Sequence, residues 1–288
     1  MDKPLLFTPG EGEAIRDNLR IKVGRPEIVV TESLYEPGMR GPDAHIHRHH
    51  VDAFWILEGR LAFVLGPRGD EMEAGARSFA VVPPDVVHTF YNPGPDDARF
   101  LNFHAPGMGF DTYLRSGYRI PYDQVDPPPD GGRPANEVIV RPPGEGEPLT
   151  LGPTEASIKV GGHDALGSLA VMEVALGPGF RGPVLHRHRA MVDSFYVLKG
   201  ILTLHLDGRK VEAPAGSYAV VPPGNDHTFS NPRGEPVRLL NVMAPGGLEQ
   251  YLKEAAAVAA GSSGPTDPEL LARIASKYDF VAAGPQPS

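Results

Sequence analysis

The sequence has no cysteine in 288 residues. Disulfides, thiolate nucleophiles and thiolate metal ligands are therefore excluded, and any metal ion must be bound by His, Asp or Glu. Long apolar runs are also missing. No stretch approaches the roughly 18 uninterrupted apolar residues of a membrane span, and the first residues contain no apolar segment of signal-peptide length. We therefore expect a soluble, cytoplasmic protein.

Clusters of basic residues are absent as well. The chain carries 27 Lys and Arg against 36 Asp and Glu, which gives a formal charge of −9 at pH 7. Nucleic acid and anionic membrane surfaces need a basic patch, so both are excluded as expected partners. We expect a small-molecule substrate as the partner, and a homodimer as the assembly to test.

Turn-forming residues are abundant. The 34 Gly and 32 Pro separate short runs rich in Val, Leu and Phe. Many short strands between turn signals are typical of an all-β protein. With 41% hydrophobic residues the chain is long enough to form two domains of ordinary size.

The second half of the chain repeats the first almost element by element. The segment PGEGE occurs at residues 9–13 and again at 143–147, DAFWILEGRLAFVL is answered by DSFYVLKGILTLHL, and VVPPDVVHTFYNP by VVPPGNDHTFSNP. The copies differ in length only in a predicted hairpin turn, where such changes are tolerated. We predict an N-terminal domain over residues 1–120, a Pro/Gly-rich connector over 121–135, a C-terminal domain over 136–260 and a tail over 261–288 with one amphipathic helix.

Each copy contains two histidines separated by one residue. In a strand such a pair projects from one face, so His45 and His47 can share a metal ion. Asp52 opens the next predicted strand, and His88 begins another after a Pro-Pro turn. Three imidazoles and a carboxylate suit Fe, Mn, Ni, Cu or Zn and leave coordination positions for a substrate. The predicted metal ligands of the second copy are His186, His188, Asp193 and His227.

These motifs resemble the two sequence motifs of the cupin family. The matching residues are His45, His47, Asp52, Gly59, Pro83, His88 and Asn92 in the first copy, and His186, His188, Asp193, Gly200, Gly216, Pro222, His227 and Asn231 in the second. The resemblance spans nearly the whole chain and implies a bicupin, with two tandem double-stranded β-helix (jelly-roll) barrels and short C-terminal helices. It also implies one divalent transition metal per barrel.

The chain departs from the cupin motifs at a few positions. Both copies carry Asp where the family usually has Glu, so Asp52 and Asp193 either bind the metal directly or act from outside its ligand set. Arg77 and Asp85 replace glycines that the second copy keeps. We therefore expect a less regular loop geometry in the first barrel.

Other side chains are candidates for the barrel interiors. Phe54, Phe90, Phe195 and Phe229 share the parity of neighbouring ligands and are predicted pocket walls, with barrel core as the alternative. His104 is matched by Met243, so these two pocket positions would make the cavities chemically different. His104 is either a satisfied core histidine or an acid/base or substrate contact in the first barrel. Outside the interiors, we expect His49 and His50 as solvated loop residues and His205 as exposed. We expect Arg40 and Arg181 to be solvated, with contact to an anionic substrate at the barrel mouths as the alternative.

The resemblance favours an oxygenase similar to the quercetinase-like dioxygenases, acting on a small aromatic or enol-bearing compound. Asp52 and Asp193 would be its catalytic residues, each accepting the proton of a substrate hydroxyl. One alternative is a non-catalytic cupin that binds metal and a small ligand for storage or sensing. Another is a cupin decarboxylase or isomerase, although no lid segment of the oxalate decarboxylase type and few cationic residues near the predicted metal are present.

Overall fold

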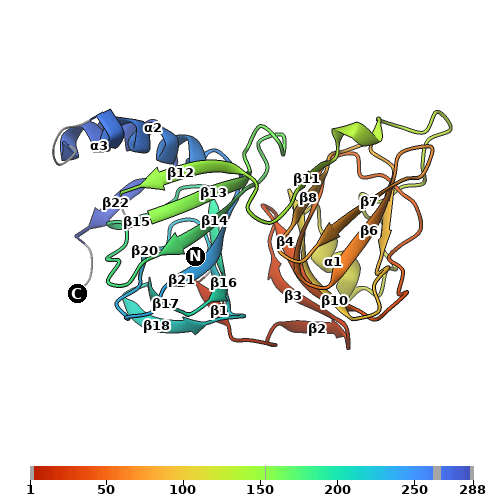
Figure 1. The fold of residues 1–288 in the computed structure, drawn as a ribbon, viewed down its shortest axis with the longest axis horizontal. Coiled ribbons are helices and arrows are strands. Elements are labelled where there is room, and N and C mark those ends of the chain that lie inside the picture. Colours follow the sequence, from red (N-terminus) through yellow and green to blue (C-terminus); the bar gives the residue numbers. More distant parts are fainter. Residues whose placement is uncertain (1–2, 153, 262–266, 286–288) are drawn as a thin grey trace. The chain divides into compact units, whose positions relative to one another are not determined.

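The computed structural model describes residues 3–152, 154–261 and 267–285 (Figure 1). The chain divides into two compact units. The N-terminal unit is formed by Gly12–Glu145 together with Asp164–Ser168. The C-terminal unit contains the remaining described residues.

The N-terminal unit is built from two antiparallel sheets. The larger one has the order β11-β8-β5-β10-β4-β3-β2 and the smaller one β7-β6-β9. The strands are β2 (Glu13–Arg16), β3 (Leu19–Gly24), β4 (Val29–Tyr35), β5 (Val51–Glu58), β6 (Arg60–Leu65), β7 (Asp70–Gly75), β8 (Phe79–Val82), β9 (His88–Tyr91), β10 (Ala98–Ala105) and β11 (Ile139–Arg141). A short 3₁₀ helix, η1 (Ala135–Glu137), precedes β11.

The C-terminal unit repeats this arrangement. Its larger sheet runs β1-β19-β16-β21-β14-β13-β12 and its second sheet β18-β17-β20-β15-β22. The strands are β1 (Leu5–Phe7), β12 (Glu147–Leu151), β13 (Thr154–Val160), β14 (Ala170–Leu176), β15 (Leu185–Arg187), β16 (Val192–Lys199), β17 (Ile201–Leu206), β18 (Arg209–Pro214), β19 (Tyr218–Val221), β20 (His227–Ser230), β21 (Val237–Ala244) and β22 (Val281–Gly284).

The antiparallel sheets of the two units confirm the predicted all-β fold with two jelly-roll barrels. Each barrel has its own apolar core. Phe54, Phe63 and Phe100 are buried at the centre of the N-terminal core. Phe195 and Met243 are buried in the C-terminal core. Burying one such side chain contributes about 1.5–3 kcal/mol to folding, and the packed rings leave the histidine-bearing strands little freedom to move.

One edge strand of each large sheet comes from outside the range predicted for its domain. Strand β1 pairs with β19, Leu5 opposite Val220, and so belongs to the C-terminal unit. Strand β11 pairs with β8, Ile139 opposite Val81, and belongs to the N-terminal unit. In the structure, therefore, each larger sheet is completed by a strand that the predicted ranges 1–120 and 136–260 place in the other domain.

The expectation of a less regular loop in the first barrel is wrong. Arg77 and Asp85 both have φ near 65°, the left-handed conformation that Gly216 and Gly224 adopt with φ of 87° and 84°. The hydrogen bonds are also repeated: the Asp85 amide donates to the His47 carbonyl at 2.7 Å, and that of Gly224 to the His188 carbonyl at 2.7 Å. The backbone geometry is kept at a cost of about 1–2 kcal/mol for each non-glycine residue in this conformation.

In the described part of the chain, three α-helices lie at the ends of the repeats. Helix α1 (Phe110–Arg115) follows β10, and α2 (Leu248–Gly261) follows β21. The predicted tail helix is α3 (Pro268–Ala275), whose N-cap Asp267 accepts a hydrogen bond from the Glu269 amide at 2.9 Å. Helix α2 packs against β12 and against α3 (Figure 1).

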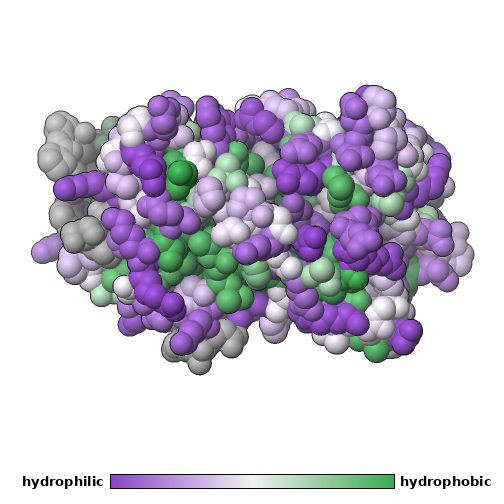
Figure 2. All heavy atoms as spheres, turned by 90° about the horizontal axis from the view of Figure 1, so that it is seen from below, coloured by the Kyte–Doolittle hydropathy of each residue, from purple (hydrophilic) through white to green (hydrophobic). Residues whose placement is uncertain are grey.

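The face of the molecule in Figure 2 is mostly hydrophilic, with apolar patches between the polar side chains. Among the described residues, no helix combines the length and hydropathy needed to cross a bilayer.

Candidate metal centres

The three predicted histidines of the N-terminal barrel converge on one point. His45 and His88 are cross-strand partners in an isolated β-bridge, and His47 lies two residues further along. All three side chains are buried, between 1% and 4% exposed. One ring nitrogen of each histidine lies within 4.8 Å of one ring nitrogen of both others. The i and i+2 spacing thus produces the shared face that the sequence predicted.

The backbone fixes which nitrogen of each ring faces this point. The Nδ1 atoms of His45, His47 and His88 lie 2.7, 2.5 and 2.9 Å from the carbonyl oxygens of Asp43, Asp123 and Val86. A carbonyl only accepts, so each Nδ1 donates and each Nε2 presents a lone pair to the centre. Burial and the neighbouring His88 lower the pKa of His45 to about 3, which keeps its lone pair free.

Asp52 lies beside the three imidazoles. Its Oδ2 is 3.3 Å from His88 Nε2 and 3.7 Å from His47 Nε2, while its Oδ1 accepts a hydrogen bond from the Asn102 side-chain amide. Burial opposes ionisation, but His104, His47 and His88 hold the pKa of Asp52 well below its usual value. The carboxylate is therefore ionised, with Oδ1 held by Asn102 and Oδ2 facing His88 and His47.

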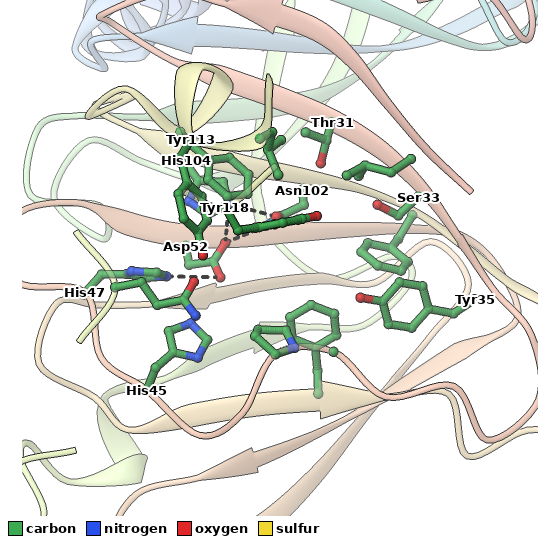
Figure 3. Close-up of a pocket in the computed structure, with 18 of the residues that line it drawn as sticks. Thr31, Ser33, Tyr35, His45, His47, Asp52, Asn102, His104, Tyr113 and Tyr118 are labelled. Carbon is green, nitrogen blue, oxygen red and sulfur yellow. Dashed lines mark hydrogen bonds and ion pairs between the residues drawn. The ribbon is translucent and has the colours of Figure 1, made fainter. Parts of the chain in front are cut away.

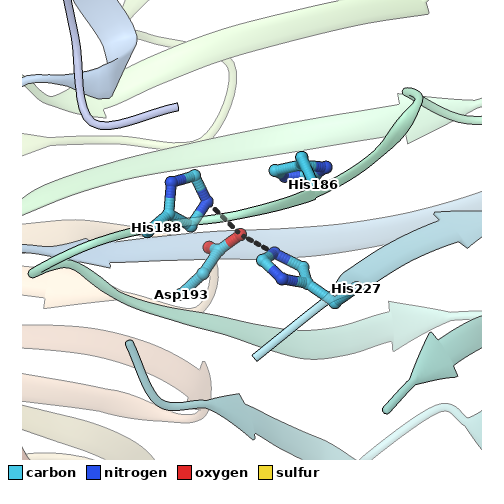
Figure 4. Close-up of side chains that lie close together, drawn as sticks. All are labelled: His186, His188, Asp193 and His227. Carbon is cyan, nitrogen blue, oxygen red and sulfur yellow. Dashed lines mark hydrogen bonds and ion pairs between the residues drawn. The ribbon is translucent and has the colours of Figure 1, made fainter. Parts of the chain in front are cut away.

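The C-terminal barrel repeats the same construction (Figure 4). His186 and His227 are cross-strand partners, and their Nδ1 atoms donate to the carbonyls of Val184 and Asn225 at 2.8 and 3.1 Å. Asp193 Oδ2 lies 3.1 Å from His227 Nε2 and 3.7 Å from His188 Nε2. Here the carboxylate and all three histidines lie within 4.8 Å of one another, whereas the N-terminal set within that distance contains the histidines without Asp52.

Both sets fit a bound cation. His47 Nε2 and His188 Nε2 are buried and have no hydrogen-bond partner among the residues that the structure describes. In each barrel the Nε2 lone pairs of two histidines face a carboxylate oxygen of the aspartate. Both sides of these contacts are hydrogen-bond acceptors, and no hydrogen lies between them. Leaving buried polar atoms unpaired costs about 1–3 kcal/mol each, and a divalent transition metal would satisfy all of them together.

The two copies of the site correspond to the two regions that a known family covers. The Cupin domain family matches residues 31–104 and 172–243, about half of the chain. The chain belongs to the cupin family. Its two barrels, each with the histidine set described above, make it a bicupin.

Known bicupins are similar over most of the chain. Quercetin 2,3-dioxygenase from Bacillus subtilis is 22% identical, covering 93% of this chain and 90% of the relative. Among solved structures, a mutant of oxalate decarboxylase from Bacillus subtilis has a TM-score of 0.61 at 15% identity, covering 98% of this chain and 90% of that one. A glyoxylate-induced protein from Pseudomonas aeruginosa has a TM-score of 0.60 at 16% identity, with 84% and 89% covered. At such identities the solved structures support the fold.

A cavity of about 320 Å³ opens onto the N-terminal set. His45, His47 and Asp52 lie at one end, and Thr31, Ser33 and Tyr35 at the other (Figure 3). The walls are largely aromatic, formed by Tyr35, Phe90, Phe100, Phe110, Tyr113 and Tyr118, and Arg16 and Arg40 also line it. The cavity therefore leads from a polar and aromatic chamber to the candidate metal ligands.

The predicted pocket residues divide between this cavity and the cores. Phe90 and His104 line the cavity. Phe54, Phe195 and Met243 are fully buried in the apolar cores, and Phe229 packs against the C-terminal core half-buried. His104 lies directly opposite Asp52 in the sheet, as Met243 lies opposite Asp193.

Two histidine predictions are wrong, while the neighbouring His49 is exposed as expected. His50 is only 1% exposed, because the Asp123 carboxylate accepts from the amides of Arg48 and His49 and from His50 Nδ1 and so folds the loop inward. His205 is 9% exposed, because its cross-strand partners Lys210 and Thr228 flank it.

Sequence reasoning missed the segments that close each site. Asp123, in the connector, accepts from the amides of the loop after His47 and accepts from His47 Nδ1 through its carbonyl oxygen. Asp279, in the tail, does the same for His188 and for the amides of residues 189–191. The signal was present as YDQV at residues 122–125 and YDFV at 278–281. Connector and tail are thus two copies of one clamp.

Proposed function

We propose that this bicupin is a metal-dependent dioxygenase that acts on a small aromatic or enol-bearing compound in its N-terminal barrel. The observation that carries the proposal is the aromatic cavity that ends at His45, His47 and Asp52. Aromatic walls with a few polar groups at one end are typical of sites that bind and orient a flat ligand. The similarity to quercetin 2,3-dioxygenase is consistent with this chemistry.

In the N-terminal barrel His45, His47 and His88 would hold the metal, which would supply Lewis acidity toward a substrate oxygen. The oxalate decarboxylase from Bacillus subtilis, which shares the fold, has Mn(II) centres. The donor set of this chain suits Mn as well as Fe, Ni, Cu or Zn. An equivalent metal in the C-terminal barrel would be held by His186, His188 and His227 together with Asp193.

Asp52 is placed to accept the proton of a substrate hydroxyl. It is ionised, its Oδ2 faces the histidine set, and Asn102 holds its other oxygen in place. The rings of Phe90, Phe100 and Tyr118 would lie against the faces of an aromatic substrate and exclude water from the reacting end. Proton transfer to a positioned carboxylate contributes typically about 10²–10⁴-fold to a rate.

The test is oxygen consumption by the metal-loaded protein with catechols, flavonols and β-diketones. We expect uptake with at least one class, its loss in His47→Ala, and its retention in His188→Ala, the matched change in the other barrel. A protein that binds these compounds without consuming oxygen would be a non-catalytic cupin. Less than one metal per chain after attempted loading would contradict both functions.

A further inference from the structure

A second group of polar side chains lies next to the N-terminal histidine set and takes no part in it. His50 Nε2 and His104 Nδ1 are 3.0 Å apart, and the Tyr122 hydroxyl lies 2.9 Å from the first and 2.8 Å from the second. His50 is 1% and His104 3% exposed. We call these three side chains the triangle.

The triangle has fewer hydrogens than its three close contacts would need as hydrogen bonds. His50 Nδ1 lies 2.8 Å from the Asp123 carboxylate, which can only accept, so the His50 hydrogen is on Nδ1. The same carboxylate also accepts from the backbone amides of Arg48 and His49. His50 Nε2 therefore points a lone pair into the triangle.

The same reasoning applies to His104. Asn102 donates through its side-chain nitrogen to Asp52 and to the Ala53 carbonyl, so its Oδ1 is an acceptor. His104 Nε2 lies 2.8 Å from that oxygen and must donate, which leaves a second lone pair on Nδ1. The Tyr122 hydroxyl is therefore the only one of the three groups that carries a hydrogen toward the others. It can donate to one ring nitrogen at a time, and His50 Nε2 and His104 Nδ1 face each other with no hydrogen between them.

A cation removes this conflict. Adjacent ligand atoms at right angles, each about 2.05 Å from a transition metal, are about 2.9 Å apart, and the triangle has edges of 3.0, 2.9 and 2.8 Å. The carboxylate behind His50 also matches the carboxylate–histidine–metal pattern of bound imidazoles.

We infer that His50, His104 and Tyr122 form a second cation site in the N-terminal barrel, with two nitrogen ligands and one phenol oxygen suited to a divalent or trivalent transition metal. The rings of Phe110, 3.7 Å from that of His104, and Tyr113, 5.1 Å from that of Tyr122, cover it. It shares no side chain with the primary sets, by which we mean His45, His47 and His88 in this barrel and His186, His188, Asp193 and His227 in the other. It lies directly beside His47, because His47, His50 and His104 offer ligand atoms within 4.8 Å of one another. It does not depend on the proposed oxygenase activity.

The C-terminal barrel provides the internal control. Met191 and Met243 stand where the N-terminal barrel has His50 and His104, and both are buried in its core. Tyr278, the counterpart of Tyr122, donates instead to Glu254 at 2.6 Å. We therefore expect three ions per chain, one primary ion in each barrel and a third in the triangle.

Equilibrium dialysis of the metal-free full chain against Zn²⁺, followed by elemental analysis, tests this count. His50→Met and His104→Met copy the C-terminal barrel and should each reduce three ions to two, whereas exposed His49→Ala should keep three. In the double variant His88→Ala, His227→Ala, which weakens both primary sites, one ion should remain. Two ions in the unaltered chain, or three in His104→Met, would overturn the proposal.

A spectroscopic measurement identifies the ligand and keeps the inference testable if a methionine variant fails to fold. A phenolate bound to Fe(III) gives a visible charge-transfer absorption, and neither primary set contains a tyrosine. The Fe(III)-loaded chain should show this absorption, Tyr122→Phe should lose it, and Tyr113→Phe should retain it. No absorption in the unaltered chain, or its persistence in Tyr122→Phe, would contradict a Tyr122 ligand.

Discussion

In the N-terminal barrel His104 lies opposite Asp52, and in the C-terminal barrel Met243 takes the same place opposite Asp193. Gln124 lines the N-terminal cavity, whereas its counterpart Phe280 stacks on His186 with ring centres 4.6 Å apart. The primary ligands are the same in both copies. The difference shows that a duplicated candidate metal site can keep its histidines and aspartate while the residues around them diverge. The ligand motif alone therefore does not say which copy would perform chemistry.

The largest expected difference between the barrels is in the effect on kcat of replacing Asp52 or Asp193. Asp52→Asn should lower kcat by about 10²–10⁴-fold, because it removes the proton acceptor that faces the cavity. Asp193→Asn should change kcat by less than about twofold. Oxygen uptake by both metal-loaded variants checks this, with metal content measured as the control. Equal losses in both variants would show that the barrels act together.

Each clamp, the connector with Asp123 or the tail with Asp279, should affect metal binding only in the barrel that it contacts. Asp123→Ala and Asp279→Ala each remove the acceptor that holds the loop after the second histidine, so Zn²⁺ affinity should fall by about 10–100-fold in that barrel alone. Asp123→Ala is measured with His227→Ala, and Asp279→Ala with His88→Ala, so that one primary set stays intact. Exposed Asp126→Ala is the matched control. A loss of Zn²⁺ affinity in the barrel that the altered clamp does not contact would contradict this prediction.

The wall of the N-terminal cavity should affect substrate binding. Phe110 lines the cavity, so Phe110→Ala should raise KM by about 5–30-fold through lost apolar contact. Its repeat counterpart Leu248 is buried in the C-terminal core, and Leu248→Ala should leave KM unchanged. Steady-state kinetics of the two variants decide this, and a raised KM in Leu248→Ala would place substrate in the other barrel.

The smallest expected effect is a pH dependence that the barrels share. The pKa of Asp123 is lowered to about 2, and that of Asp279 is lowered as well by the amides of residues 189–191. A lowered carboxyl pKa stabilises the fold above about pH 4 and ceases to do so as the pH falls toward 2. The stability difference between the metal-free chain and Asp123→Asn, below about 1 kcal/mol for a partly exposed group, should shrink over that range. Urea titrations check this, and Asp279→Asn should show the same trend.

Much of the fold and of the primary sites could be predicted because the signals are local. Two histidines at i and i+2 share a strand face whatever surrounds them, and the repeat shows where each barrel ends its strands. The clamps could not be predicted in this way. Asp123 meets His50 across 73 residues of sequence, from a Pro/Gly-rich segment whose conformation is set by the carbonyls and amides it contacts.

The histidine errors have the same physical origin. His50 follows the motif in a polar loop, and only the carboxylate of Asp123 turns it inward. Arg77 and Asp85 likewise seemed unsuited to a glycine conformation, yet the hydrogen bonds from the Arg77 amide to Ile56 and from the Asp85 amide to His47 keep the backbone in place. In each case tertiary contacts overrode a local preference.

The pairing of β1 with β19 has a consequence for biogenesis. Leu5 leaves the ribosome early, but its partner Val220 is more than 200 residues later in the chain. At about 5–20 residues per second the first strand must remain without its partner for about 10–40 s. During synthesis the N-terminal barrel would therefore fold while β1, which precedes it in the sequence, still lacks its partner strand β19. A chaperone that binds nascent chains would find β1 exposed throughout that interval.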